Sequence, residues 1–405
     1  MDAFGTIKGN KMNNEIEWLV GVDHDELLKL RFDRFRSIEL SKTLLQEKCS
    51  ETNIQLTDAV INEKAKGLSS AIDSALNYWD IKGQSLNARI LSRYYSLLQL
   101  TIAEEVSAIT NNNGLKEIQK HTEQGHGLTT FSQDYNDNIL NNYYCYIRHD
   151  GHFYHYLKHL NISNLETITH IKKIDKIDDE SRFYLVSLAD LFRRIPELNT
   201  VLEEYTGEVP LSLHFGYDSS SNYAVEEKLR EEYTKKTGTF IIDVPKRETS
   251  KITTYVKIYT SSQKMNIEYL KKIDTPFDNF KLIKKNKDEE GYISCSFIHD
   301  NTGIWWDHIP HYKSSYSATT YIIPLLKEIN DPIVINYMLL YTLSIIVRYL
   351  PDMWYKIVQG KYANIGRLID YYISIYDHVI PHQMLERITG KKLYLSFPGG
   401  FDSLV

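Results

Sequence analysis

Two apolar stripes with helical spacing constrain the fold of this chain of 405 residues more than any other feature. In residues 58–79 and again in residues 91–109, apolar side chains recur at steps of three and four, which places them on one face of an α-helix. The stripes comprise Ile61, Ala65, Leu68, Ile72, Ala75 and Trp79, and then Leu91, Tyr95, Leu98, Ile102, Val106 and Ile109. Because only a short break around residues 82–84 separates them, we expect the two helices to pack antiparallel at the centre of a helical domain.

The C-terminal part of the chain is expected to be helical as well, from Tyr321 through Ile380. Its most apolar run, Ile333–Val347, would span about 22 Å as a helix. That length falls short of the roughly 30 Å hydrocarbon core of a bilayer, and Asn336 interrupts the apolar sequence. The run therefore predicts a buried core helix, and we expect no membrane partner.

The segment between these helical parts has a different pattern. Four stretches are rich in β-branched and aromatic residues, which is typical of strands, and a charged helix is expected after the first of them. The strands are predicted at residues 209–217, 238–244, 250–260 and 291–299, and the helix at residues 224–236. The sequence therefore predicts a mostly α fold in which the helical N-terminal and C-terminal parts pack together, with a smaller α+β segment in the middle of the chain. The expected domains are an N-terminal helical domain at 1–205, the α+β segment at 206–320, and a C-terminal helical region with an extended tail at 321–405.

Charge, cysteine content and missing motifs narrow the classes of function. The formal net charge is −6, so no overall basic field draws the chain to nucleic acid. Cys49, Cys145 and Cys295 are widely spaced and form no CxxC pair, and the first residues lack the apolar core of a signal peptide, which together indicate the cytoplasm. The sequence has no P-loop, dinucleotide-binding glycine turn, HExxH motif or serine nucleophile elbow, and we expect no cofactor.

Four sequence motifs resemble the bacterial YaaC-like family. They are RYYSLLQLTIAEE from Arg93, GHGL at residues 125–128, SLADLFRRIPEL at residues 187–198 and YMLLYTLSIIVRYLPDMW at residues 337–354. Their order along the chain matches that family from about residue 60 to 385. The resemblance implies a bacterial cytoplasmic protein of unestablished activity.

The helix that contains RYYSLLQL and the loop at His126 are also similar to the helical core of the HEPN superfamily. Many HEPN proteins are metal-independent ribonucleases or toxin and defence components, and their sites pair an arginine with a histidine four to six residues apart. In such a site the histidine transfers protons and the arginine stabilises phosphate charge.

This second resemblance implies two candidate catalytic pairs. Arg148 and His155 have the expected spacing, but Asp150-Gly151 between them predicts a turn that would break the helix needed to place both on one face. Arg93 with His126 is the other candidate pair.

Three histidines after that turn are possible metal ligands. His152, His155 and His159 would share a face if a helix begins at Gly151. No carboxylate or cysteine joins them at a clear ligand spacing, so no metal site is predicted.

The sequence leaves open whether the chain is an enzyme. The first hypothesis is an interaction protein, or effector-associated component, of a bacterial defence or stress system that acts through a protein partner, since catalytic motifs are absent and tyrosine is abundant. The alternative is a HEPN-type ribonuclease with RNA as its substrate. A homo-oligomer is compatible with both hypotheses, and a small-molecule pocket between the helical body and the α+β segment is a third option.

Overall fold

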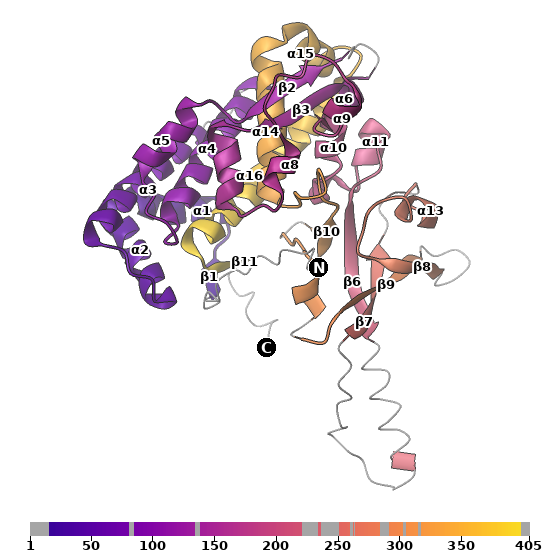
Figure 1. The fold of residues 1–405 in the computed structure, drawn as a ribbon, viewed down its shortest axis with the longest axis horizontal. Coiled ribbons are helices and arrows are strands. Elements are labelled where there is room, and N and C mark those ends of the chain that lie inside the picture. The colour runs from indigo at the N-terminus through magenta and orange to yellow at the C-terminus, as the bar shows by residue number, and fades with distance from the viewer. Residues whose placement is uncertain are drawn as a thin grey trace. The chain divides into compact units, whose positions relative to one another are not determined.

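The computed structural model describes residues 16–80, 85–133, 138–220, 234–235, 251–259, 262, 264–283, 291–302, 305–314 and 317–397 (Figure 1). The chain divides into two compact units. One, here called the helical unit, comprises Met1–Leu191 and Pro324–Val405, and the other, the sheet unit, comprises Phe192–Ile323. The three-way division at 205/206 and 320/321 that the sequence indicates stays a prediction about domains.

The chain is mostly helical, as predicted. The longer helices of the helical unit are α1 (His24–Asp33), α2 (Ile38–Thr52), α3 (Asp58–Trp79), α4 (Leu86–Ser107), α5 (Leu115–Glu123), α7 (Gly151–His159), α14 (Pro332–Tyr349), α15 (Pro351–Val358) and α16 (Ala363–Thr389). Short helices are α6 (Ile139–Asn142), α8 (Leu165–Ile168), α9 (Asp179–Arg182), α10 (Leu188–Phe192), α11 (Leu202–Thr206) and α13 (Ile267–Leu270). The last two of these belong to the sheet unit.

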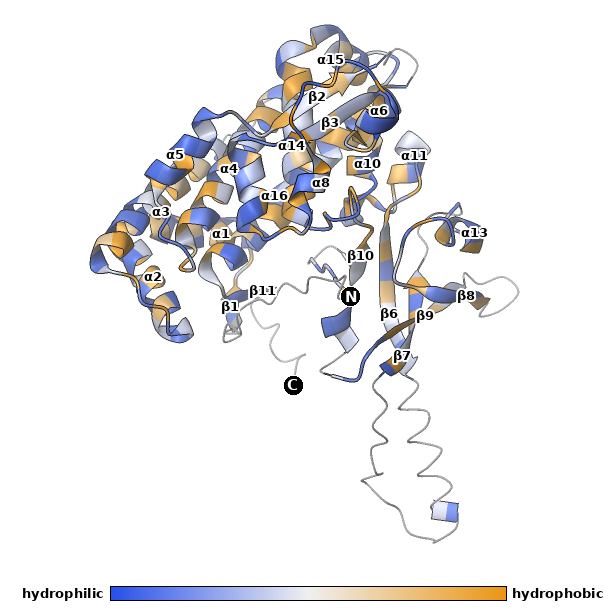
Figure 2. Cartoon of the chain, in the orientation of Figure 1, coloured by the Kyte–Doolittle hydropathy of each residue, from blue (hydrophilic) through white to orange (hydrophobic). Residues whose placement is uncertain are grey.

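Helices α3 and α4 form the largest helix–helix contact, as their apolar stripes predict. Figure 2 shows hydrophobic and hydrophilic residues alternating along α3. The Thr57 side chain caps the start of α3 by accepting from the Val60 amide. Helix α4 also packs against α14 and α16, so it is enclosed on several sides. The break at residues 82–84 lies outside the described residues.

Helix α14 begins where Asp331 accepts hydrogen bonds from the amides of Ile333 and Val334, with Pro332 in the first turn. Among the described helices, α14 alone is long and apolar enough to cross a membrane. However, 72% of that stretch is buried inside the protein. The predicted core helix is therefore confirmed. Pro351 starts the next helix, α15, so α14 ends one turn after Ser344, and Arg348 lies in its last turn.

Two small sheets complete the helical unit. Strand β2 (Leu128–Ser132) pairs antiparallel with β3 (Tyr143–Arg148), which also pairs with β4 (Thr169–His170) and β5 (Val186–Ser187). Strand β1 (Ile16–Val20) pairs in parallel with β11 (Lys392–Ser396), which joins the two ends of the described chain.

The sheet unit contains a five-stranded antiparallel sheet with the order β10-β6-β7-β9-β8. The strands are β6 (Ser212–Ser220), β7 (Lys251–Tyr259), β8 (Asp278–Ile283), β9 (Tyr292–Asp300) and β10 (Thr320–Ile322). Alternate side chains of one face, including Leu213, Phe215, Val256 and Ile258, form its core. Three of the predicted strand stretches coincide with β6, β7 and β9. The strand expected at 238–244 and most of the helix expected at 224–236 lie outside the described residues.

Candidate functional site

Arg93, a predicted catalytic residue, holds two helices together. Its Nε donates to Asp377 Oδ1 at 2.6 Å and its Nη2 to Asp377 Oδ2 at 2.9 Å, which is a two-pronged ion pair from α4 to α16. Its Nη1 donates to the Trp79 carbonyl at 3.0 Å. The Arg93 side chain is 7% exposed. Its donors are therefore engaged inside the protein and do not meet His126.

His126 contacts the next residue along α4 instead. The His126 Nδ1 lies 2.9 Å from the Tyr94 hydroxyl, and no described residue bonds its Nε2. Burial and the positive charge of Arg348 both lower the pKa of His126, so the ring is neutral at pH 7. The positive charge that lowers the pKa of His126 thus belongs to Arg348, in the last turn of α14.

Arg148 and His155 lie on different elements. Arg148 is the last residue of β3 and its Nη2 is 3.5 Å from Asp150, whereas His155 lies in α7. The ring of His155 stacks on that of His121 with centroids 3.5 Å apart. The chain bends at His149-Asp150 as expected, and α7 begins at Gly151, so the two residues do not share a helix.

A glycine-rich contact fixes the position of His126. The amide of His152 donates to the Gly125 carbonyl, and the amide of Phe153 donates to the His126 carbonyl, each at 3.0 Å. The loop carbonyls therefore accept from the first turn of α7, whose amides have no partner within the helix. At Gly151, with φ +83°, a Cβ would lie 2.5 Å from the Gly127 nitrogen, so the two backbones meet where only glycine fits.

Arg348 is the cation of this region, and the sequence did not single it out. Its Nε donates to the Ser344 carbonyl at 3.1 Å, its Nη2 to Ser344 Oγ at 3.2 Å, and its Nη1 to the Tyr95 hydroxyl at 3.3 Å. Its Cζ lies 5.0 Å from the Tyr349 ring centroid. No carboxylate of the described chain lies within ion-pair distance of this guanidinium, which is partly exposed.

Aromatic rings continue from Arg348 across the surface. The ring of Tyr95 stacks on that of Tyr78 with centroids 5.3 Å apart and planes 27° apart. Tyr78 is 38% exposed and Tyr349 is 64% exposed. We call Tyr78, Tyr95, His126, Arg348 and Tyr349 the Arg348 cluster. It combines an unneutralised cation, a neutral histidine and exposed aromatic faces.

Two tyrosine rings lead from His126 into the core. The Tyr94 ring contacts that of Tyr337 with centroids 5.9 Å apart, and Tyr337 contacts the ring of His152 at 6.3 Å. The Tyr337 hydroxyl is buried without a hydrogen-bond partner in the described chain. The surface cluster is thereby continuous, through aromatic contacts, with a buried histidine.

His152 shares a buried environment with Glu105. Its Nδ1 lies 3.6 Å from Glu105 Oε1, and the two side chains are 1% and 6% exposed. The Thr101 hydroxyl donates to the Leu98 carbonyl and lies 3.1 Å from His152 Nε2, so Nε2 must donate and Nδ1 must accept. Burial raises the pKa of Glu105 to about 8 and lowers the pKa of His152 to about 3. Both groups are therefore neutral at pH 7, and the Glu105 hydroxyl is the donor available to Nδ1.

A second buried network is structural. The Tyr156 hydroxyl donates to Glu104 Oε2 at 2.6 Å, and Arg387 Nη2 donates to Asp331 Oδ2 at 2.5 Å. Arg387 also lies 3.8 Å from Glu104. These pairs join α4, α7, α16 and the start of α14, and every charge in them has an opposite partner.

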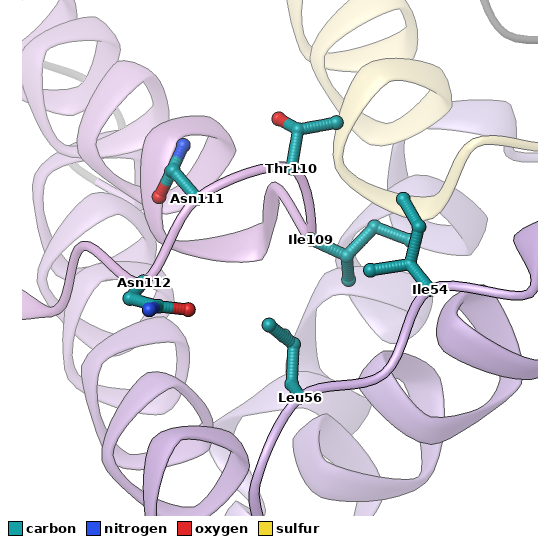
Figure 3. A pocket seen from close by; sticks show the side chains of 6 residues that line it. All are labelled: Ile54, Leu56, Ile109, Thr110, Asn111 and Asn112. Carbon is teal, nitrogen blue, oxygen red and sulfur yellow. The ribbon is translucent and has the colours of Figure 1, made fainter.

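The hollow in Figure 3 is a different kind of surface feature. It measures about 490 Å³ and is lined by Ile54, Leu56, Ile109, Thr110, Asn111 and Asn112. Near it the Lys64 ammonium donates to Asn111 Oδ1 and to the carbonyls of Ala108 and Asn113, and burial lowers the pKa of Lys64 to about 8. Lys64 is thus engaged in capping the end of α4, and the hollow carries no charged lining residue.

No metal centre is found in the part of the chain that the structure describes, where no three His, Cys, Asp or Glu side chains are placed to hold an ion. His152 contacts the Thr101 hydroxyl and His155 stacks on His121, so two of the three histidines after the turn have other partners. The Arg348 cluster is therefore the candidate site.

Comparison with known proteins places the chain in a family. A family model described as YaaC-like Protein matches residues 33–388, which is most of the chain. The chain therefore belongs to the YaaC-like family, as its motifs indicated. No curated protein and no solved structure matches it.

Proposed function

We propose that this YaaC-like protein binds a phosphate-bearing ligand at the Arg348 cluster. One observation carries the proposal: the Arg348 guanidinium is fixed by three hydrogen bonds to neutral oxygens and has no carboxylate partner among the described residues. By contrast, Arg89, Arg93 and Arg387 each donate to an aspartate. A fixed, planar and unneutralised guanidinium is suited to two-pronged binding of phosphate oxygens.

The remaining donors support this assignment. Arg348 uses three of its five N–H groups internally, which leaves two for a ligand. When the Tyr94 hydroxyl donates to His126 Nδ1, the other ring nitrogen carries the proton and donates outward. A phosphate between Arg348 and His126 would therefore meet donors from both side chains.

The first prediction concerns Arg348→Gln and inorganic phosphate. At constant ionic strength, orthophosphate at roughly ten times its dissociation constant is expected to stabilise the wild-type protein by about 1.4 kcal/mol. Arg348→Gln is expected to abolish this stabilisation, because the variant has neither the charge nor the fork of donors. Thermal unfolding with and without phosphate measures the effect.

Arg367→Gln is the matched control, since Arg367 is an exposed arginine on α16 and its loss changes the net charge equally. It is expected to respond to phosphate as the wild type does. Equal stabilisation of Arg348→Gln and wild type would contradict the proposal. Comparing unfolding midpoints without phosphate separates a loss of binding from a loss of the internal bonds of Arg348.

A second candidate function is RNA cleavage, which the resemblance to the HEPN superfamily implies. The charge of Arg348, which lowers the pKa of a neutral His126, supports it. The expected pair has other partners, since Arg148 contacts Asp150 and His155 stacks on His121. This mechanism uses the other tautomer of His126, in which Nδ1 donates to the Tyr94 hydroxyl and the unprotonated Nε2 removes the proton of a ribose 2′-hydroxyl. The 2′-oxygen attacks the adjacent phosphorus while Arg348 stabilises the phosphate charge. The 5′-oxygen leaves and takes a proton from solvent water, which yields a 2′,3′-cyclic phosphate and a 5′-hydroxyl.

Sequencing of RNA ends after expression in bacteria tests this second candidate. New ends are expected with the wild type and not with His126→Ala or Arg348→Ala. His155→Ala serves as the control and is expected to cleave as the wild type does. Cleavage that persists in His126→Ala, or that is lost in His155→Ala alone, would exclude His126 as the base.

The protein partner and the role in a defence or stress system stay predictions, as does the cytoplasmic location. Formation of a homo-oligomer also stays a prediction. All four of these predictions are compatible with phosphate binding at the Arg348 cluster.

A further inference from the structure

The Arg348 cluster has an order of contacts that resembles a strand of nucleic acid. Tyr78 stacks on Tyr95, the Tyr95 hydroxyl accepts from Arg348, and Arg348 lies against the Tyr349 ring. Aromatic rings therefore precede and follow a single cation in this series. In single-stranded nucleic acid, bases likewise precede and follow each phosphodiester.

The two outer rings are exposed beside the cation, so a ligand can reach them. Tyr78 and Tyr349 are 38% and 64% exposed, whereas Tyr94, one residue from Tyr95, is fully buried. Exposed tyrosines occur elsewhere on the protein, and these two differ because they lie in one series of contacts with Arg348. Exposed tyrosine rings beside an arginine are the surface on which bases stack in proteins that bind single strands.

Tyr95 takes part both in the stacking of aromatic rings and in the hydrogen bonding of the cation. Its ring stacks on Tyr78, and its hydroxyl accepts a hydrogen bond from Arg348 Nη1 at 3.3 Å. The aromatic surface and the cation are thus one side chain apart. A ligand whose phosphate binds Arg348 therefore has an aromatic face available to its adjoining base.

We propose that the ligand of the Arg348 cluster is a dinucleotide segment of single-stranded nucleic acid, with its phosphodiester on Arg348 and its two bases on the exposed tyrosines. The inference rests on the proposed phosphate-binding function and deepens it. The net charge of −6 is compatible with it, because one local cation and two stacked bases replace a broad basic surface. RNA and DNA share this base–phosphate–base chemistry.

Titration with four probes tests the inference, using the full chain and isothermal calorimetry. The probes are orthophosphate, ribose 5-phosphate, the ribodinucleotide ApA and its deoxy counterpart. Both dinucleotides are expected to bind at least about tenfold more tightly than ribose 5-phosphate, since each stacked base adds affinity. A preference of ApA over deoxy-ApA would identify RNA as the source, and equal affinity would identify single strands of either kind.

Three variants separate stacking from phosphate binding. Tyr78→Leu and Tyr349→Leu are each expected to weaken ApA binding by about fivefold or more while orthophosphate binding stays unchanged. Tyr371→Leu is the control, because Tyr371 is 49% exposed on α16 and makes no ring contact in the cluster. It is expected to bind every probe as the wild type does.

The two proposals fail on different results. If ApA binds no more tightly than ribose 5-phosphate, or if both leucine variants keep full ApA affinity, the dinucleotide inference is overturned and phosphate binding stands. If the wild type binds no orthophosphate and no probe loses affinity in Arg348→Gln, the proposed function itself is overturned.

Discussion

Replacement of Gly151 by alanine is expected to lower the free energy of unfolding of the helical unit by about 3 kcal/mol or more. Two costs add together. The positive φ of +83° strains any residue with a Cβ, typically by about 1–2 kcal/mol. The new Cβ would also lie 2.5 Å from the Gly127 nitrogen and 2.7 Å from the Gly125 carbonyl, and both neighbours are backbone atoms that cannot rotate away. Urea-induced unfolding followed by circular dichroism measures the loss.

Gly125→Ala is the matched control for the backbone strain alone, because Gly125 lies in the helical unit as Gly151 does. Gly125 has φ +107°, and no atom lies within 4 Å of the position of its Cβ. This variant is expected to lose only about 1–2 kcal/mol. Equal losses in the two variants would show that the contact between the loop and α7 relaxes, and that it does not fix His126 as tightly as described.

The second large effect concerns Glu105→Gln and pH. Burial raises the pKa of Glu105 from 4.5 to about 8, so the folded protein holds a proton that the unfolded chain has lost between these values. Stability from this group is fully present below pH 4.5 and is lost as pH rises towards 8. Glutamine resembles the protonated acid at every pH. Relative to wild type, Glu105→Gln is therefore expected to gain about 1.4 kcal/mol per pH unit across this range.

Unfolding free energies at several values between pH 5 and 8 measure this difference. Glu123→Gln, at an exposed position on α5, reports the background effect of removing one carboxylate. Parallel stability curves for Glu105→Gln and wild type would contradict a neutral Glu105. They would instead indicate that His152 takes the proton and that the two groups form a buried ion pair.

The helices could be predicted from the sequence because their signals are local. The apolar steps in residues 58–79 coincide with α3, and Asp331-Pro332 marks the start of α14. The apolar stripe in residues 91–109 predicts helix α4 but not which of its faces is most buried. Its expected face includes Leu91, Tyr95 and Leu98, which are only partly buried, whereas Ile90, Tyr94 and Leu97 on another face are fully buried. Since α4 is covered by three helices, periodicity alone could not identify its most buried face.

The candidate site required contacts that spacing along the sequence does not encode. His126 was a predicted site residue, but its cation is Arg348 and not Arg93. The bond between Arg348 and Tyr95 joins residues 253 positions apart. A pattern of arginine and histidine within six residues cannot find such a pair. The motif that contains Arg348 was recognised from the sequence only as a marker of the family.

The helical unit is built from two separate parts of the chain, which has a consequence for synthesis of the protein. The helical unit is interrupted by Phe192–Ile323, and α4 receives α14 and α16 only from the second part of the chain. A ribosome needs roughly ten seconds to translate the intervening unit. During that interval Asp377, the ion-pair partner of Arg93, has not yet been synthesised. The α4 surface that packs on α14 in the folded protein is then exposed to solvent. For that time the nascent chain carries an incomplete helical unit, and the sheet unit can fold before the helical unit does.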